Sequence, residues 1–242
     1  MNGFLEALQF LTILPLGQAR PFLPEKMVSF FPVVGLVIGG MLSGFDWLVG
    51  QWWPRPTAAV LDVLLLVIIT GALHLDGLAD TADGLYAKRP LEKALAIMKD
   101  SRVGAMGVVA LVSGLALKWA GLVSLSEHRQ WLLIIIPSYA RASMLLGMQL
   151  LPYGRPEGGT AHAFFASPIK ASGLWGLLPA IVISGLLGWK GLWLNACFLI
   201  LVAATLFFYK RRVNCITGDM LGALGEICES ALFLLISMGG SA

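Results

Sequence analysis

The sequence has few charged residues, which make up 13% of its 242 positions, against roughly 25% in a typical soluble domain. Its hydrophobic fraction is 57% and its mean hydropathy is +0.81. Apolar runs such as 57–73 and 131–151 are long enough to cross a hydrocarbon core about 30 Å thick. The composition therefore excludes a soluble globular protein and predicts an all-α, polytopic integral membrane helix bundle.

Other signals are missing as well. Cys197, Cys215 and Cys228 are odd in number and lack Cys-x-x-Cys spacing, so we expect free thiols rather than disulfides or a metal site. No Gly-x-x-x-x-Gly-Lys motif, dinucleotide fingerprint or Ser-His-Asp spacing is present, which excludes the soluble nucleotide-binding folds. We expect no nucleic-acid partner. No basic segment precedes the first apolar run, so we expect no cleaved signal peptide.

The apolar runs predict about seven transmembrane helices within a single membrane domain, residues 1–242. A short helix in the membrane interface is expected before them, because Phe4, Leu8 and Leu11 recur at helical spacing with Glu6 between them. Pro15 is expected to end this helix. The seven expected spans are residues 30–49, 57–73, 104–124, 131–151, 172–188, 192–209 and 220–238.

Lysine and arginine residues are divided unequally between the two sides of this topology. Short loops rich in these residues stay in the cytoplasm, so the richer side and the N-terminus are predicted to be cytoplasmic, and an odd number of spans places the C-terminus outside. Arg55, Arg129 and Lys190 fall on the poorer side. Lys118 and Arg141 fall inside spans, and Lys118 is expected to reach the outer interface. The richer side holds 12 of the 17, namely Arg20, Lys26, Lys88, Arg89, Lys93, Lys99, Arg102, Arg155, Lys170, Lys210, Arg211 and Arg212.

Acidic residues gather on the predicted cytoplasmic side, and the first group lies between the second and third spans. Asp76, Asp80 and Asp83 recur at i, i+4 and i+7, so on a helix they share one face within roughly 60°. Carboxylates at the membrane edge are expensive and indicate function. Carboxylate oxygens suit Mg²⁺ or Mn²⁺ held together with substrate phosphates. The alternative is a solvated face paired with neighbouring basic residues such as Lys88 and Arg89.

Further polar residues follow on the same side. Asp100 and Ser101 precede the third span and are candidates to cap it, while Arg102 is a candidate phosphate ligand. Arg155, in a loop rich in glycine and proline, is a second phosphate candidate. His74, beside the first acidic group, is either a metal ligand or a hydrogen-bonded structural residue.

The last polar group lies at the entry of the seventh span. Thr217, Gly218 and Asp219 are expected to begin a helix whose free amides face an anion. Glu226 follows Asp219 by two turns, so it lies about 10 Å deeper on nearly the same face. Arg141, in the middle of the fourth span, is a candidate partner for a structural ion pair with Glu226, and a catalytic role for Glu226 is equally open.

In these motifs the sequence resembles the cobalamin synthase family (adenosylcobinamide-GDP ribazoletransferase), a family of bacterial and archaeal integral membrane enzymes. The resemblance covers most of the chain, and its most specific parts are the Leu-His-Leu-Asp-Gly-Leu-Ala-Asp-Thr-Ala-Asp-Gly and Lys-Asp-Ser-Arg-x-Gly segments. Ile13 departs from the family pattern, which favours Arg there. The matching segments are residues 9–15, 31–35, 74–85, 98–104 and 217–223, with Glu226 and Glu229.

The resemblance implies the last assembly step of the cobalamin nucleotide loop, at the bacterial cytoplasmic (inner) membrane. Adenosylcobinamide-GDP and α-ribazole, or its 5′-phosphate, would give adenosylcobalamin or its 5′-phosphate with release of GMP, in a Mg²⁺-dependent reaction. In this interpretation Asp76, Asp80 and Asp83 hold Mg²⁺, while Asp219 or Glu226 orients or deprotonates the attacking ribazole hydroxyl. The residues expected to contact the substrates are Asp100, Ser101, Arg102, Arg141, Arg155, Thr217, Gly218 and Glu229.

Two other functions remain open. A phosphotransferase of the CDP-alcohol class also uses an Asp-rich helix at the cytoplasmic face. Its usual motif has an Arg directly after the Ala, whereas no Arg follows Ala79 in this sequence. An ion-coupled carrier would explain acidic residues and Arg141 inside spans, but it predicts polar residues throughout the bilayer. The 28 glycines allow close helix contacts and a homo-oligomer.

Overall fold

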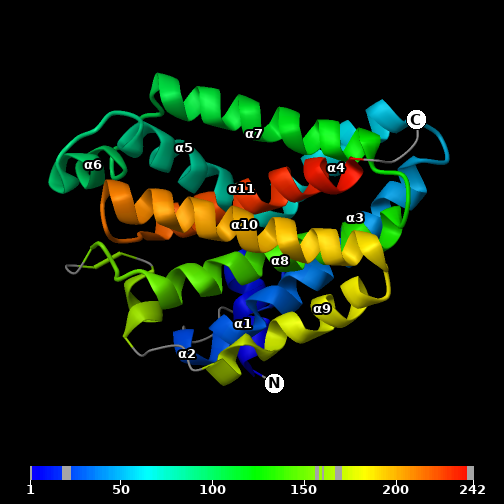
Figure 1. Ribbon diagram of the computed structural model, residues 1–242, viewed down its shortest axis with the longest axis horizontal. Helices are drawn as coiled ribbons and strands as arrows, with labels where there is room; N and C mark the ends of the chain where they lie inside the picture. Colours follow the sequence, from blue (N-terminus) through cyan, green and yellow to red (C-terminus); the bar gives the residue numbers. More distant parts are fainter. Residues whose placement is uncertain (1, 18–22, 156–157, 160, 167–170, 239–242) are drawn as a thin grey trace.

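Long helices that run side by side form most of the computed structural model, which describes residues 2–17, 23–155, 158–159, 161–166 and 171–238 (Figure 1). The predicted all-α architecture is confirmed. The predictions that fall outside the described residues concern Arg20 and Lys170 of the charge count, and Pro156, Glu157 and Thr160 of the loop around Arg155.

Within the described residues, five helical segments are long and apolar enough to cross a membrane, or six if α4 and α5 form one bent span. Nearly continuous apolar sequence keeps each segment helical, because a helix satisfies its own backbone hydrogen bonds where no water is present. The five are α2, η1 and α3 taken together (Pro24–Val49), α7 (Ala105–Ser124), α8 (Arg129–Leu150), α10 (Trp189–Arg212) and α11 (Gly218–Ser237).

Two of the predicted spans are not single long helices, so the count of seven is not confirmed. Residues 57–73 correspond to α4 (Arg55–Thr70), after which Gly71 and Ala72 adopt φ angles of 59° and 56°. These left-handed residues end α4, and α5 (Leu73–Leu85) continues at 91° to it. Residues 172–188 are divided between the 3₁₀ helix η3 (Ala171–Leu177) and α9 (Leu178–Gly185). Pro179, which lacks an N–H donor, lies in the first turn of α9.

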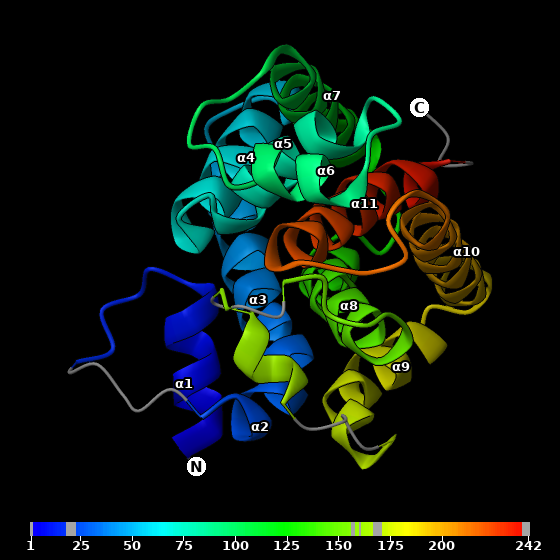
Figure 2. The ribbon, with the colours of Figure 1, turned by 90° about the vertical axis from the view of Figure 1, so that its left-hand side faces the viewer.

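Helix α1 (Asn2–Leu11) lies across the bundle, as Figure 2 shows by presenting α1 from the side and α7 and α10 end-on. This is the orientation expected of a helix parallel to the membrane plane. The helix ends at Leu11, before Pro15, and the backbone N–H of Ile13 donates to the carbonyl of Ile69 at 2.8 Å. Residues after α1 are therefore attached to the end of α4.

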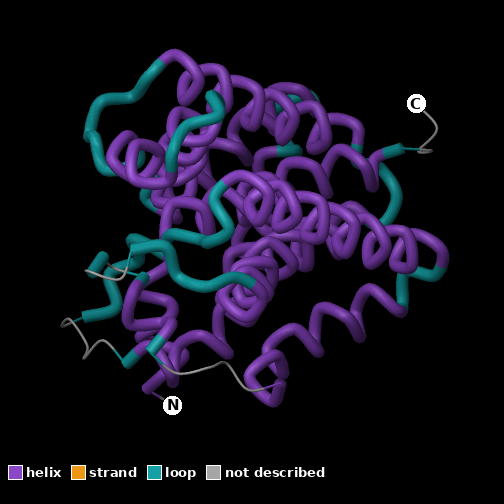
Figure 3. Tube along the Cα trace, turned by 60° about the vertical axis from the view of Figure 1, so that its left-hand side comes forward, coloured by secondary structure: helices purple, strands orange, loops and turns teal. Residues whose placement is uncertain are grey.

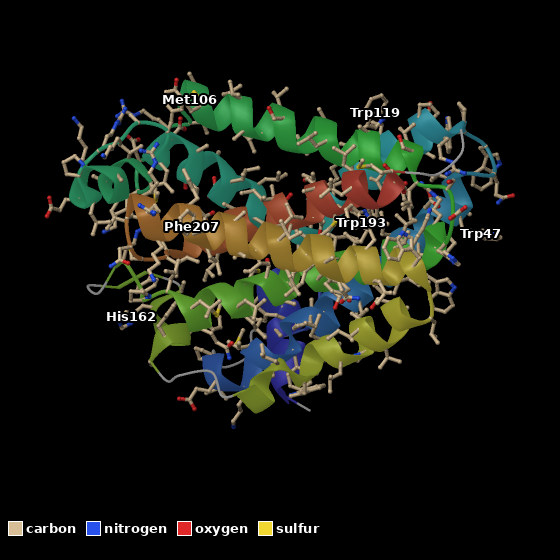
Figure 4. The ribbon with its side chains drawn as sticks, viewed as in Figure 1. Trp47, Met106, Trp119, His162, Trp193 and Phe207 are labelled. Atoms are coloured by element: carbon tan, nitrogen blue, oxygen red, sulfur yellow. The ribbon has the colours of Figure 1, made fainter. Side chains whose placement is uncertain are left out.

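The two ends of the bundle differ in composition. Helices α8 and α10 finish at the end where α7 and α11 begin, and Figure 3 shows the longer loops gathered at that end. Its loops carry lysine and arginine residues, among them Lys88, Arg89 and Arg155. Trp47 and Trp119 lie at the opposite end (Figure 4), where exposed tryptophans are typical of a membrane interface. We call the two ends the basic end and the tryptophan end.

Helix α11 occupies the middle of the bundle, in contact with α5, α7, α8 and α10. It begins at the basic end and finishes at the tryptophan end, so it carries the chain away from the loops. Helices α3 and α8 pack closely because Gly39 of α3 lies against α8, where an added Cβ would lie 2.1 Å from the Ile134 carbonyl. The remaining elements are α6 (Leu91–Ile97) and η2 (His162–Phe165).

Candidate active site

The candidate active site lies where α5 crosses the beginning of α11, at the basic end. Gly77 of α5 lies against Asp219, and a Cβ added to Gly77 would lie 2.6 Å from the Asp219 carbonyl oxygen. Gly222 faces His74 in a similar way, with an added Cβ 3.3 Å from the Cα of His74. Only a residue without a side chain at position 77 permits this approach, which brings the acidic face of α5 to the start of α11.

The start of α11 has the predicted capping arrangement. The Thr217 hydroxyl accepts a hydrogen bond from the backbone N–H of Met220 at 3.3 Å, and the helix begins at Gly218. Asp219 lies in the first turn, where the positive end of the helix dipole favours negative charge. The predicted helix start at Thr217 and Gly218 is confirmed, and its free amides are directed toward the basic end of the bundle.

A short backbone pairing brings Arg155 to the same place. Tyr153 and Ile216 form an isolated parallel bridge, in which the N–H of Gly154 donates to the Ile216 carbonyl at 2.9 Å. The Arg155 guanidinium then donates to Oδ2 of Asp219 at 2.7 Å. The loop that follows α8 is thus attached to the loop that precedes α11, and an arginine is fixed beside the first turn of α11.

Four carboxylates surround the first turn of α11. We call them the acid rim: Asp76, Asp80, Asp83 and Asp219. Asp80 interacts electrostatically with the other three and with Arg155. Asp76 is exposed and Asp80 is half-buried, and neither makes a hydrogen bond or an ion pair with the described part of the chain. Among the described residues, Arg155 is the cation that acts on Asp80 and Asp219, so the four acidic groups leave an excess of negative charge at the site.

The acid rim is not a complete metal cage. Among the described residues, no group of three or more histidine, cysteine, aspartate or glutamate side chains is placed to hold a metal ion. Mg²⁺ is usually bound by one or two carboxylates together with water and substrate phosphates, so an incomplete set of protein ligands fits that ion. The arrangement suits a cation that arrives with a phosphorylated substrate.

Asp83 also has a structural task at the edge of the acid rim. Its Oδ2 accepts from the backbone N–H of Gly104 at 2.7 Å and its Oδ1 from that of Gly107 at 2.9 Å. Gly104 directly precedes α7 (Ala105–Ser124) and Gly107 lies in its first turn, so Asp83 caps this helix from a distant part of the sequence. The predicted capping by Asp100 or Ser101 is wrong, because the residue that precedes α7 is Gly104 and the amides at this end donate to Asp83 instead.

Asp100 instead pairs with Arg102 on the loop before α7. The guanidinium donates to the Asp100 carboxylate at 2.6 Å, and the Arg102 side chain is 86% exposed. Hydrogen bonds from Arg102 hold the pKa of Asp100 at about 2, well below its ordinary value. Ser101 is exposed between them. Asp83 attaches this loop to the acid rim through Gly104, so Arg102 lies on a segment that borders the site.

Four of the charged residues lie deeper, and we call them the buried charge cluster: Lys118, Arg141, Glu226 and Glu229. Lys118 donates to Glu226 at 2.7 Å and to Glu229 at 2.8 Å, and Arg141 pairs with Glu229. All four side chains are buried. The cluster joins α7, α8 and α11, and its two positive and two negative charges balance.

This cluster corrects two predictions. Arg141 has Glu229 as its partner rather than Glu226, and Lys118 does not reach the outer interface. A lysine inside an apolar span needs a nearby carboxylate, and Glu226 and Glu229, three residues apart on α11, provide two. That spacing is the sequence signal that could have identified Lys118. No described contact joins the cluster directly to the acid rim, and catalytic or substrate roles for Arg141, Glu226 and Glu229 stay predictions.

Two hollows are lined in part by residues of α5 and α11. A cavity of about 140 Å³ is lined by Asp76, Gly77, Gly218 and Asp219, together with His74 and apolar residues. A larger apolar groove of about 530 Å³ runs between α5, α7, α10 and α11, with Met106 in its wall (Figure 4). The smaller cavity shares residues with the acid rim, whereas the groove shares none.

Comparison with known proteins identifies the family. A model described as cobalamin-5-phosphate synthase matches residues 3–237. The chain belongs to the cobalamin-5-phosphate synthase family. It is 38% identical to an adenosylcobinamide-GDP ribazoletransferase of Geotalea daltonii, over 97% of this chain and 96% of the relative. A relative of the same name from Desulforamulus reducens is 36% identical over 96% of this chain and 95% of its own length. No solved structure matches the chain.

Membership of the cobalamin-5-phosphate synthase family confirms the resemblance given by the motifs, and it favours neither a CDP-alcohol phosphotransferase nor a carrier. In this family member, α5 and the start of α11 bring most of the predicted residues together. The residues so assembled are Asp76, Asp80, Asp83, Arg155, Thr217, Gly218 and Asp219. Sequence reasoning assigned no role to the phenylalanine rings that line the small cavity, although Phe10 and Phe31 lie in segments that match the family, because apolar residues in a membrane protein are too common to be informative.

Proposed function

We propose that the chain is an adenosylcobinamide-GDP ribazoletransferase that joins α-ribazole, or its 5′-phosphate, to adenosylcobinamide-GDP and releases GMP. The names of its relatives support this activity. The observation that carries it is the acid rim at the start of α11, with Arg155 beside it. A diphosphate and an excess of carboxylates repel each other, so a divalent cation between them is the arrangement that stabilises both.

We assign Asp76 and Asp80 as the residues that would hold Mg²⁺, because neither uses its carboxylate in a hydrogen bond or ion pair within the described chain. Asp83 is a third candidate, since each of its oxygens keeps a lone pair after accepting one amide. When bound, the ion would neutralise charge on the diphosphate and on the departing GMP.

The chain's own residues would position and activate the reactants. The 3′-hydroxyl of ribazole would attack the phosphorus attached to the cobinamide arm, forming a new P–O bond while the bond to GMP breaks. Asp219 would accept the hydroxyl proton. Both described hydrogen bonds to Asp219, from Arg155 and Thr217, reach Oδ2, so Oδ1 is available for this role. Arg155 and the first amides of α11 would contact phosphate oxygens.

We prefer Asp219 to Glu226 as the base. Glu226 is buried and its carboxylate accepts a hydrogen bond from Lys118. The ammonium group stabilises the charged carboxylate, which makes Glu226 a weaker proton acceptor. Glu229 is engaged by both Lys118 and Arg141. We therefore assign Glu226, Glu229 and Arg141 to holding the helices beneath the site, and Arg102 and Arg155 to the phosphates.

We also propose that the basic end faces the cytoplasm of a bacterial inner membrane, because lysine and arginine are concentrated in its loops. The substrates would then reach the acid rim from the cytoplasm. Reconstituted vesicles with the basic end outward are expected to turn over externally added substrates without permeabilisation, and activity only after permeabilisation in such vesicles would contradict the orientation.

The proposed function is tested by GMP release from purified protein reconstituted in lipid and given adenosylcobinamide-GDP. Release is expected only when both α-ribazole (or its 5′-phosphate) and Mg²⁺ are present, and a cobalamin product should accumulate in equal amount. No release by folded protein with all components present would overturn the proposal.

A further inference from the structure

The cavity of about 140 Å³ beside the acid rim has an unusual lining. Three phenylalanine rings from three separate elements form one part of it: Phe10 of α1, Phe31 of α3 and Phe164 of η2. The ring centroids lie 6.0 Å apart for Phe10 and Phe31, 5.3 Å for Phe10 and Phe164, and 5.6 Å for Phe31 and Phe164. Met144 and Met148 of α8 add polarisable sulfur atoms. This lining suits a flat aromatic group.

The same cavity contains an unsatisfied polar atom. His74 lines it, and Nε2 of His74 is buried without a hydrogen-bond partner in the described part of the chain. An imidazole nitrogen can donate or accept one hydrogen bond, and leaving such an atom unpaired in a buried position is unfavourable. A ligand with a ring nitrogen would satisfy His74 and fill the cavity beside the phenylalanine rings.

The polar groups of the cavity lie to one side of this apolar lining. Asp76, Gly218 and Asp219 belong both to the cavity and to the site at the start of α11, where Arg155 also lies. A molecule with an aromatic part and a sugar could place its ring against the phenylalanines and its sugar beside Asp219. This arrangement would bring a ribose hydroxyl close to Oδ1 of Asp219.

We propose that this cavity binds the aromatic base of the ribazole nucleoside, with a ring nitrogen hydrogen-bonded to His74. The inference rests on the proposed function and adds the position of the acceptor substrate. The volume suits a small flat aromatic group, because an engineered cavity of about 150 Å³ binds benzene, whereas a corrin ring needs a far larger space. Guanine fits less well, because its several polar edge groups would face phenylalanine and methionine side chains without partners.

A substitution that fills the cavity provides the test. Ala161 lines the cavity and is buried, so Ala161→Leu adds volume where the base would lie. Ala166 lies in the same loop region but lines a separate open pocket and is exposed, which makes Ala166→Leu a matched control. Ala161→Leu is expected to raise the KM for α-ribazole at least tenfold while the KM for adenosylcobinamide-GDP changes less than twofold. Ala166→Leu should change neither constant.

Free benzimidazole, a flat aromatic base with a ring nitrogen, tests the wild-type protein directly. It should inhibit competitively against α-ribazole and not against adenosylcobinamide-GDP, and His74→Phe should weaken this inhibition at least tenfold. This variant keeps a ring of similar size and removes Nε2. Inhibition competitive with adenosylcobinamide-GDP, or an unchanged KM for α-ribazole in folded Ala161→Leu and His74→Phe, would overturn the assignment.

A binding measurement separates this inference from the proposed function. Equilibrium dialysis of radiolabelled α-ribazole against wild-type protein, without the second substrate, reports occupancy of the cavity alone. Binding that Ala161→Leu weakens tenfold, without GMP release in the complete reaction, would leave the cavity assignment intact and reject the proposed transfer. Normal transfer by wild-type protein, with binding unaffected by Ala161→Leu, would reject the cavity assignment alone.

Discussion

The buried charge cluster and the acid rim both include residues of helix α11, but charges are balanced in the cluster and negative charge is in excess in the rim. In the cluster, two carboxylates and two cations are buried together, with Lys118 2.7 Å from Glu226 and 2.8 Å from Glu229. In the rim, four carboxylates have Arg155 as their neighbouring cation, and Asp76 and Asp80 have access to water. A charge inside a bilayer must be compensated, whereas one at its edge can remain in excess. This excess of negative charge is the observation on which the proposed metal site rests.

The largest effect on stability is expected when the cluster loses its balance. Glu229→Gln leaves Lys118 and Arg141 with one carboxylate between them, and breaking a buried ion pair costs about 3–5 kcal/mol. Thermal unfolding in detergent can be followed with a thiol-reactive dye, because Cys197, Cys215 and Cys228 are buried and free. We expect a large fall in the unfolding midpoint.

The matched control for this change is Asp100→Asn, which removes one partner of the exposed ion pair with Arg102. Water screens that pair, so no measurable shift of the midpoint is expected. Equal shifts in the two variants would contradict the distinction between compensated buried charge and surface charge.

The largest effect on turnover is expected in the acid rim. Asp80→Asn should lower kcat by about 10²–10³-fold, as does the loss of one electrostatic contact to a transition state. The unfolding midpoint should not fall, because Asp80 makes no hydrogen bond or ion pair within the described chain. The measurement is GMP release at saturating substrates over a range of Mg²⁺ concentrations. Glu92→Gln, at an exposed acid on α6, is the control and should leave kcat unchanged.

Retained activity in Asp76→Asn, Asp80→Asn and Asp83→Asn alike would refute the metal assignment. A loss of activity in Asp80→Asn together with an equal loss of stability would instead place this residue with the buried charge cluster. The distinction between the two regions therefore holds only if substitutions in the acid rim lower activity without lowering stability.

Asp83 belongs to both kinds of region and should show an intermediate effect. Asp83→Asn weakens the cap of α7, because an amide has one acceptor oxygen for the N–H groups of Gly104 and Gly107. A loss of about 1–2 kcal/mol in unfolding free energy is expected, typical of a cap. The Mg²⁺ concentration that gives half-maximal activity should change less than in Asp80→Asn. Unchanged stability with lost Mg²⁺ activation would make Asp83 a metal ligand alone.

The smallest effect is expected on the exposed loop. Asp100→Asn removes the partner of Arg102, and we expect kcat/KM to change by about twofold or less. The lowered pKa of Asp100, about 2, means that the ion pair is present above that pH and is lost only as the pH falls through it. Profiles of kcat/KM between about pH 5 and 9 should therefore have the same shape in both proteins. A new ionisation in the variant would show that Asp100 affects the chemistry.

Parts of the fold were predictable because they depend on local chemistry. Long apolar runs predicted the helices α3, α7, α8, α10 and α11. Thr217 predicted where α11 begins, because a hydroxyl before a helix accepts a hydrogen bond from a nearby amide. Residues 57–73 and 172–188 were less predictable. Hydropathy does not detect the left-handed turn at Gly71 and Ala72, or the 3₁₀ segment before Pro179.

The candidate site was predictable as a set of residues but not as a geometry. Helical spacing grouped the aspartates of α5, but it could not distinguish Asp83, which caps α7, from Asp80, which makes no such bond. Arg155 was visible only as a basic residue in a loop. Its contact with Asp219 depends on the pairing of Tyr153 with Ile216, residues far apart in the sequence.

The sequence by itself determined that this protein is a helical membrane protein of the cobalamin-5-phosphate synthase family with acidic residues at its basic end, because hydropathy, charge and motifs are local properties. The tertiary structure decided which charges are partners. Lys118 meets Glu226 across 108 positions of sequence, and Arg129 meets Asp46 across 83. Such pairings depend on how helices pack, which is a long-range property, and they leave the acid rim with uncompensated charge.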